Sequence, residues 1–208
     1  MSRCGDVYAN RVTGERAVVL RGDEDGFGRS ALVHLTVRPG GAVVGEHIHP
    51  TVEERFRVVA GRLATRIAGV DRVLGPGEEA VAAAGTPHDW WNDGDQEASV
   101  VVELTPPDPR FEQMIATLFG LANRGDTDAR GRPAPPQMAL TASEFSDVIR
   151  LTRPPIVVQR LAFAVLGAIG RRRGLHGTYP ELLTPHGRTT PAPAALAAAG
   201  LDGPSRTG

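Results

Sequence analysis

The sequence predicts a mainly β domain, a sandwich or a barrel, followed by a helical extension. From about residue 16 to 105, short apolar runs alternate with glycine and proline, which is typical of antiparallel all-β domains. No helical pattern lies between these runs, so parallel βαβ units are not expected. After Pro109 the apolar residues change to helical spacing.

The expected strands are short and rich in β-branched residues, and turn-forming residues bound them. The run 31–37 alternates and then stops at Arg-Pro-Gly-Gly. The run 56–67 reads as two strands that meet near Gly61. The full set of expected strands lies at 17–20, 31–37, within 56–67 on either side of Gly61, 72–78 running into a turn, and 98–104.

Three helical segments are expected after the last strand. Residues 110–122 have helical apolar spacing, and 123–136 read as a loop. Residues 141–150 open with a capping-box pattern and are expected to be helical. A third segment, 154–173, starts at two prolines, where a helix tolerates them.

The segment 154–173 is apolar on nearly all sides, but Gln159 and Arg160 interrupt it. It is too short to span a bilayer. We expect a helix buried against the barrel or at a dimer interface. The alternative is a membrane contact by residues 156–173, in which an interfacial helix places Arg171 to Arg173 near lipid headgroups.

These patterns divide the chain into four parts. Residues 1–15 form an N-terminal segment, 16–108 the β-barrel and 109–183 the helical extension. Residues 184–208 are of low complexity, and we expect them to be a disordered tail.

Composition excludes several classes of protein. The net charge of −1 offers no strong field to attract nucleic acid. All positive charge is arginine, so lysine Schiff-base chemistry is excluded. Cys4 is the one cysteine, which rules out an intrachain disulfide. The N-terminus lacks an apolar signal-peptide core, so a cytoplasmic location is expected.

Three of the six histidines can meet without straining the strand assignment. His47 and His49 are two residues apart, so on a strand their side chains share one face. His88 follows a Gly-Thr-Pro turn, and a strand that starts there can aim it at the same point. Imidazole suits zinc, copper, iron and nickel, and an added carboxylate admits manganese. The pattern therefore predicts a divalent metal site.

Two segments resemble the paired motifs of the cupin superfamily. Residues 41–61 match the first motif, with Gly41, His47, His49, Glu54 and Gly61 at its spacing. Residues 77–92 match the second through Gly77, Gly85, His88 and Asn92, although Ala83 stands where that family usually has proline.

The resemblance covers roughly residues 30–105. It implies a small antiparallel jelly-roll barrel with a metal inside, held by His47, His49, Glu54 and His88. It also implies a homodimer, because cupins often pair through barrel strands.

Whether Glu53 or Glu54 is the acidic ligand can also be argued from strand parity. In an unbroken strand Glu53 would share the face of the two histidines, but Pro50 disturbs the pairing. Downstream, Glu54 has the parity of the apolar residues Phe56 and Val58, which a barrel interior takes. Glu54 is therefore expected to point inward as a ligand, and as a proton acceptor if it acts in catalysis.

The pocket beside the metal is expected to include Phe56, Trp90 and His34. Three imidazoles and one carboxylate leave two positions of an octahedral site open. We expect an oxygenase-type oxidoreductase that acts on a small organic molecule, with Fe(II) as first choice of metal and Mn, Ni, Zn or Cu as others. The alternatives are a metal-dependent isomerase or cyclase of a sugar or secondary metabolite, and a non-catalytic cupin that binds a small ligand.

Overall fold

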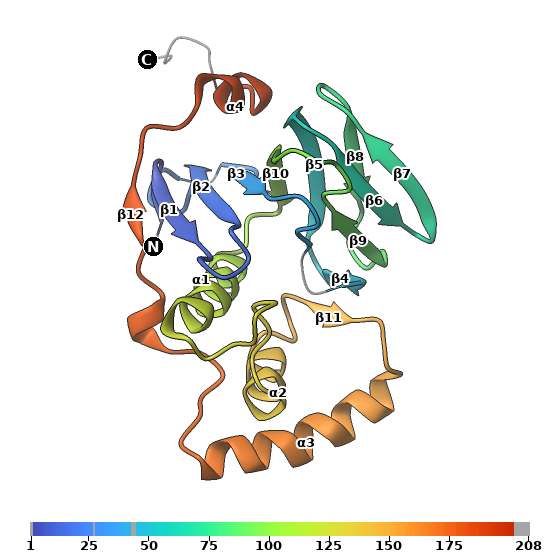
Figure 1. Ribbon diagram of the computed structural model, residues 1–208, viewed down its shortest axis with the longest axis vertical. Helices are drawn as coiled ribbons and strands as arrows, with labels where there is room; N and C mark the ends of the chain where they lie inside the picture. The colour runs from blue at the N-terminus through green and yellow to red at the C-terminus, as the bar shows by residue number, and fades with distance from the viewer. Residues whose placement is uncertain (1, 27, 43–44, 202–208) are drawn as a thin grey trace.

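The computed structural model describes residues 2–26, 28–42 and 45–201. Two antiparallel sheets face each other; the first three α-helices of the chain lie below them in the view of Figure 1, and the fourth lies above. This arrangement confirms the predicted jelly-roll barrel with a C-terminal helical extension.

The two sheets contain all the strands of the described residues. In spatial order, the larger sheet consists of β12 (Gly187–Arg188), β1 (Asp6–Ala9), β2 (Arg16–Arg21), β3 (Ala31–Val37), β10 (Ala98–Thr105), β5 (Glu53–Ala60) and β8 (Glu79–Ala82). The smaller sheet consists of β11 (Arg150–Leu151), β4 (His47–Ile48), β9 (His88–Trp91), β6 (Leu63–Ile67) and β7 (Val70–Leu74).

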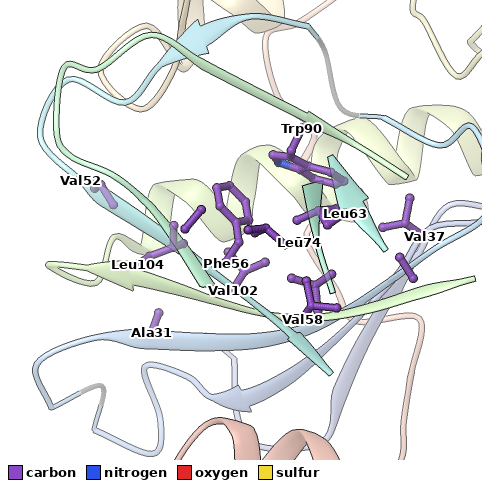
Figure 2. Packing of buried hydrophobic residues seen from close by; sticks show 13 residues of the cluster. Ala31, Val37, Val52, Phe56, Val58, Leu63, Leu74, Trp90, Val102 and Leu104 are labelled. Carbon is purple, nitrogen blue, oxygen red and sulfur yellow. The ribbon is translucent and has the colours of Figure 1, made fainter. Parts of the chain in front are cut away.

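The barrel core lies between the inner faces of the two sheets (Figure 2). Phe56 pairs with Val102 across β5 and β10, and both side chains point inward. From the smaller sheet, Leu63 and Trp90 pack against them. Phe56 is 1% exposed, so truncating it to alanine should cost about 3–5 kcal/mol.

Strand β5 alternates as its sequence predicts. Glu54, Phe56 and Val58 are buried, whereas the residues between them are partly exposed. On the outer face, Arg55 and Arg57 pair with Glu79 of β8. The inward orientation of Glu54 and the outward orientation of Glu53 are therefore confirmed.

Helix α1 (Pro109–Arg124) covers the part of the larger sheet that β1 and β2 form. The Asp108 side chain caps it by accepting a hydrogen bond from the backbone N–H of Arg110, and Pro109 occupies the first turn. Its buried residues, Ala116 and Phe119 among them, pack against β1 and β2.

The helix expected at 141–150 is wrong in position. Helix α2 spans Pro135–Glu144, and its two leading prolines set the start. The capping-box residues therefore lie in its last turns. Phe145 and Val148 are buried beside Met114 of α1. Because these two side chains are buried, the residues after Glu144 leave the helix and lead into β11.

Helix α3 (Ile156–Arg172) packs on α2 and does not cover the barrel. The expected burial of this helix against the barrel is therefore wrong. Gly167 and Gly170 form the contact, and a Cβ at Gly170 would lie 2.7 Å from Cδ1 of Leu140. Tight packing on α2 thus uses the glycine-bearing face. Within the described residues, no helix combines the length and hydropathy that a membrane span needs.

Residues 184–201 are ordered, in contrast to the disordered tail expected for 184–208. Val7 in β1 pairs with Gly187 in β12, and the 3-10 helix η1 (Pro180–Leu182) precedes β12. Helix α4 (Pro193–Ala198) buries Ala195 completely against Leu20 and Val101. The alanine-rich sequence is ordered because its small apolar side chains fit flat on the outer face of the sheet. Residues 202–208 lie outside the described residues.

Candidate metal centre

Four buried side chains converge inside the barrel. His47 on β4 lies directly opposite His88 on β9, as partners of one antiparallel pair. His49 follows β4 on the same face, and Glu54 comes from β5. Each offers one ligand atom, and these four atoms lie within 4.8 Å of one another. All four residues are at most 4% exposed.

The backbone fixes the proton position on each imidazole. The Nδ1 atoms of His47, His49 and His88 lie 2.7–2.8 Å from the carbonyl oxygens of Gly45, Val148 and Thr86, in that order. A carbonyl oxygen can only accept, so each Nδ1 carries the proton and donates it. The three Nε2 atoms therefore face the cluster with lone pairs available to a metal.

This arrangement places acceptors against acceptors. Glu54 Oε2 lies 3.0 Å from His88 Nε2 and 3.4 Å from His49 Nε2. His49 Nε2 has no hydrogen-bond partner among the described residues, although it is buried. Three lone pairs and a carboxylate in a dry site require a cation among them, either a proton or a metal. The donor set therefore fits a metal ion, and the cluster could hold one.

Protonation near the cluster follows from burial and from Glu54. Burial lowers the pKa of His47 to about 4, so its imidazole is neutral at pH 7. Burial acts in the same direction on His49, but the Glu54 carboxylate and the Val148 carbonyl outweigh it and raise the His49 pKa. Burial would raise the pKa of Glu54, but hydrogen bonds donated to its carboxylate from His49 and His88, when a proton stands in the cluster in place of a metal, hold that pKa below its usual range. Glu54 is therefore an anion, as a metal ligand must be.

The helical extension completes this site. The carbonyl that orients His49 belongs to Val148, between α2 and β11. Strand β11 then pairs with β4, with Leu151 opposite His47. The Phe111 ring of α1 packs edge-on against the His49 ring at a centroid distance of 5.3 Å. The extension thus holds the strand and one of the rings on which the cluster depends.

A cavity of about 540 Å³ opens beside the cluster. His47, His49 and Glu54 form part of its wall. Most of the rest is apolar and comes from the larger sheet and α1, including Val19, Val33, Leu35, Ile115, Leu118 and Phe119. A cavity of this size and polarity suits a small organic molecule.

The three predicted pocket residues fall in different places. Trp90 lines the cavity. Phe56 lies behind it, in ring contact with Trp90 and His88, and belongs to the core. His34 is outside the lining, because it occupies the face of β3 opposite Val33 and hydrogen-bonds Ser99 at 2.7 Å.

Sequence reasoning missed Glu15, which also lines the cavity. Its side chain is 6% exposed, and Thr13 donates a hydrogen bond to Oε2. Its Oε1 atom is buried without a hydrogen-bond partner in the described part of the chain. Burial raises the pKa of this carboxyl. The signal was present, since Glu15 shares the parity of the inward-facing Ala17 and Val19.

Comparison with known proteins agrees with the barrel. Residues 33–103 match the cupin domain model, and no curated protein matches the chain. Among solved structures, a sugar phosphate isomerase from a cupin superfamily of Silicibacter pomeroyi is 27% identical, with a TM-score of 0.41, over 50% of this chain and 69% of that one. A protein from Thermus thermophilus is 26% identical, with a TM-score of 0.36, over 38% of this chain and 75% of that one.

A predicted oxalate decarboxylase of Thermotoga maritima is also similar, at 16% identity and a TM-score of 0.43, over 50% of this chain and 94% of that one. The family match spans both segments that contribute the four converging side chains. Residues 33–103 are therefore a cupin domain, and helices follow it in the chain.

Proposed function

We propose that this cupin is a metal-dependent enzyme that acts on a small, mainly apolar organic molecule. The observation that carries the proposal is the cluster of His47, His49, Glu54 and His88, whose metal-facing atoms border a largely apolar cavity. A metal ion held there would supply Lewis acidity towards a substrate oxygen. The donor set suits Fe, Mn, Ni, Zn or Cu.

For the reaction, we favour isomerisation or cyclisation over oxygenation. Moving a proton within one molecule requires a protein group that can both hold and release it. Glu15 has these properties, because it is a buried carboxyl with a raised pKa and a free oxygen that borders the same cavity. The apolar walls would exclude water, and Glu15 Oε1 would hold or take the proton. Oxygenation has no need of such a residue.

The oxygenase-type reaction is the second candidate, with Fe(II) as the metal. Its support is the ligand count, because a metal held by three imidazoles and one carboxylate would supply oxidation chemistry with room left for exogenous ligands. The two candidates differ in their need for oxygen. Turnover that is equally fast with and without oxygen supports the isomerase or cyclase, and turnover that stops without oxygen supports the oxygenase.

Metal content is the first test. Protein purified without added metal should contain about one metal ion per chain, as measured by inductively coupled plasma mass spectrometry. His88→Ala should lose it, and the exposed His176→Ala, as matched control, should keep it. Metal-loaded protein is then screened, with and without oxygen, against small hydroxy and keto compounds. A wild-type protein that takes up no metal would refute the proposal. Metal uptake without turnover of any compound would refute the enzyme and support a non-catalytic binding protein.

A further inference from the structure

Helix α3 exposes an apolar face that no other described part of the chain covers. Its opposite face is buried, with Gly167 and Gly170 against Leu140 of α2 and Gln159 hydrogen-bonded to the carbonyl oxygens of Leu151 and Pro154. Residues four apart form one stripe along a helix, and the exposed side follows this rule. The apolar residues of the stripe and its start are Ile156 (49% exposed), Val157 (74%), Val158 (52%), Leu161 (69%), Val165 (53%) and Ile169 (37%).

The chain around this face is strongly basic. Residues 148–180 contain six arginines and no aspartate or glutamate. All six are exposed without an ion-pair partner in the described residues. Five of them belong to α3 or to the residues next to its ends: Arg153, Arg160, Arg171, Arg172 and Arg173. They lie at both ends of α3 and, through Arg160, beside the stripe. The positive charge is therefore local, because the whole chain has a net charge of −1.

The face is also accessible. Figure 1 shows α3 at the lower end of the molecule, with α2 and β11 above it and the rest of both sheets farther away. Nothing in the described structure lies on its outer side. A large flat partner can therefore approach α3 without meeting the barrel or the cavity.

We propose that α3 binds the surface of an anionic membrane, lying in its plane with the apolar stripe among the headgroups. An apolar stripe bordered by arginines is the pattern of interfacial helices, because the stripe gains from burial and each arginine from anionic lipid. Helix α3 lacks the length and hydropathy that spanning would need.

Charge argues against a second copy of the chain as occupant. In an antiparallel pair, Arg171 to Arg173 of one copy would approach Arg153 and Arg160 of the other. The segment has no acidic residue to neutralise them, and like charges across an interface are unfavourable. Anionic lipid supplies the missing negative charge.

Vesicle binding by the full chain tests the proposal without metal or substrate, so its outcome is independent of the proposed enzyme function. The probes are vesicles of phosphatidylcholine alone and of phosphatidylcholine with phosphatidylserine. Co-sedimentation should occur with the anionic vesicles at low salt and fall at high salt. Replacing Arg171, Arg172 and Arg173 by glutamine should weaken binding at least tenfold.

The apolar stripe has a matched control on the barrel. Leu161→Gln with Val165→Gln should also weaken binding at least tenfold, because both lie on the stripe. Val70→Gln with Val73→Gln changes two exposed valines on β7, at 61% and 49% exposure, and should leave binding unchanged. All these positions are exposed, so the variants should fold, which circular dichroism checks.

Three results would overturn the proposal. The first is no binding to anionic vesicles, and the second is an equal loss in the stripe and β7 variants. The third is a wild-type dimer in light scattering that the Leu161 and Val165 substitutions dissociate. That last result would assign the face to contact between two copies.

Discussion

Replacing Glu54 by alanine should remove most of the stabilisation that a metal ion gives this protein, whereas replacing Glu53 should not. The two residues are neighbours on β5 but face opposite sides. Glu54 is 4% exposed and contacts His49 and His88. The Glu53 side chain is 40% exposed, and its one ion pair, with Arg55, is 3.6 Å long.

The size of the effect follows from ligand linkage. Losing a group that only orients a ligand costs about 10–100-fold in metal affinity, so losing a direct ligand should cost at least about 100-fold. At a metal concentration of about 100 times the wild-type Kd, binding stabilises the protein by about 2.7 kcal/mol. A 100-fold weaker variant at the same concentration keeps only about 0.4 kcal/mol.

Thermal unfolding with and without metal measures this difference. For a chain of this size, about 2–4 °C of Tm corresponds to 1 kcal/mol. Metal should therefore raise the Tm by about 5–11 °C in the wild type and in Glu53→Ala, and by about 1–2 °C in Glu54→Ala. The exposed pair of Glu53 contributes at most about 1 kcal/mol, so its loss should lower the metal-free Tm by at most about 2–4 °C, and each variant is compared with its own metal-free form. Equal metal shifts in the two variants would show that the inward carboxylate is not a ligand.

Three further outcomes are expected. Gly61→Ala should lower the free energy of unfolding in urea by about 1–3 kcal/mol, because φ is +75° and a Cβ would lie 2.6 Å from the Glu97 carbonyl oxygen. Gly77→Ala, at φ +84° in open space, should lower it less, and equal losses would show that crowding at Gly61 does not matter. Burial raises the pKa of Glu15, so ionising this carboxyl destabilises the fold once the pH exceeds its pKa in the unfolded chain. Glu15→Gln should therefore raise the Tm more at pH 8 than at pH 5, and the reverse trend would refute the buried charge. Metal affinity, measured by chelator competition, should fall with falling pH and should begin to fall above the ordinary histidine pKa of about 6.5. The reason is that His49, whose pKa Glu54 raises, must release its proton to bind the metal; an affinity independent of pH would contradict this.

The barrel and the orientation of Glu54 could be predicted because both depend on local alternation. On β5, one residue in two is apolar, and the acid in phase with those residues faces inward. The spacing of glycines and histidines then brought His88 to the same point from a distant strand. Parity did not place His34, because a single histidine on a strand gives no sign of which face is the cavity.

Other features depend on contacts that no short window of sequence contains. Strand β1 pairs with β12 from the opposite end of the sequence, so neither segment alone reads as part of a sheet. Helix α4 is ordered only because the outer face of the sheet is apolar beneath it. The capping-box pattern near Thr141 led to a wrong prediction of where the helix begins, because Pro135 and Pro136 already start it.

The groups that hold the three imidazoles in position are all main-chain carbonyls, those of Gly45, Thr86 and Val148. A main-chain carbonyl is the same in every residue type, so these contacts place no demand on the side chains at the three positions. Of the three, the partly exposed Thr86 should tolerate substitution, whereas Gly45 has φ +91° and Val148 is buried, so both are restricted for reasons other than the imidazole contact. Inserting or deleting one residue near any of the three should misalign an imidazole. The imidazole contacts themselves thus depend on loop length more than on residue identity.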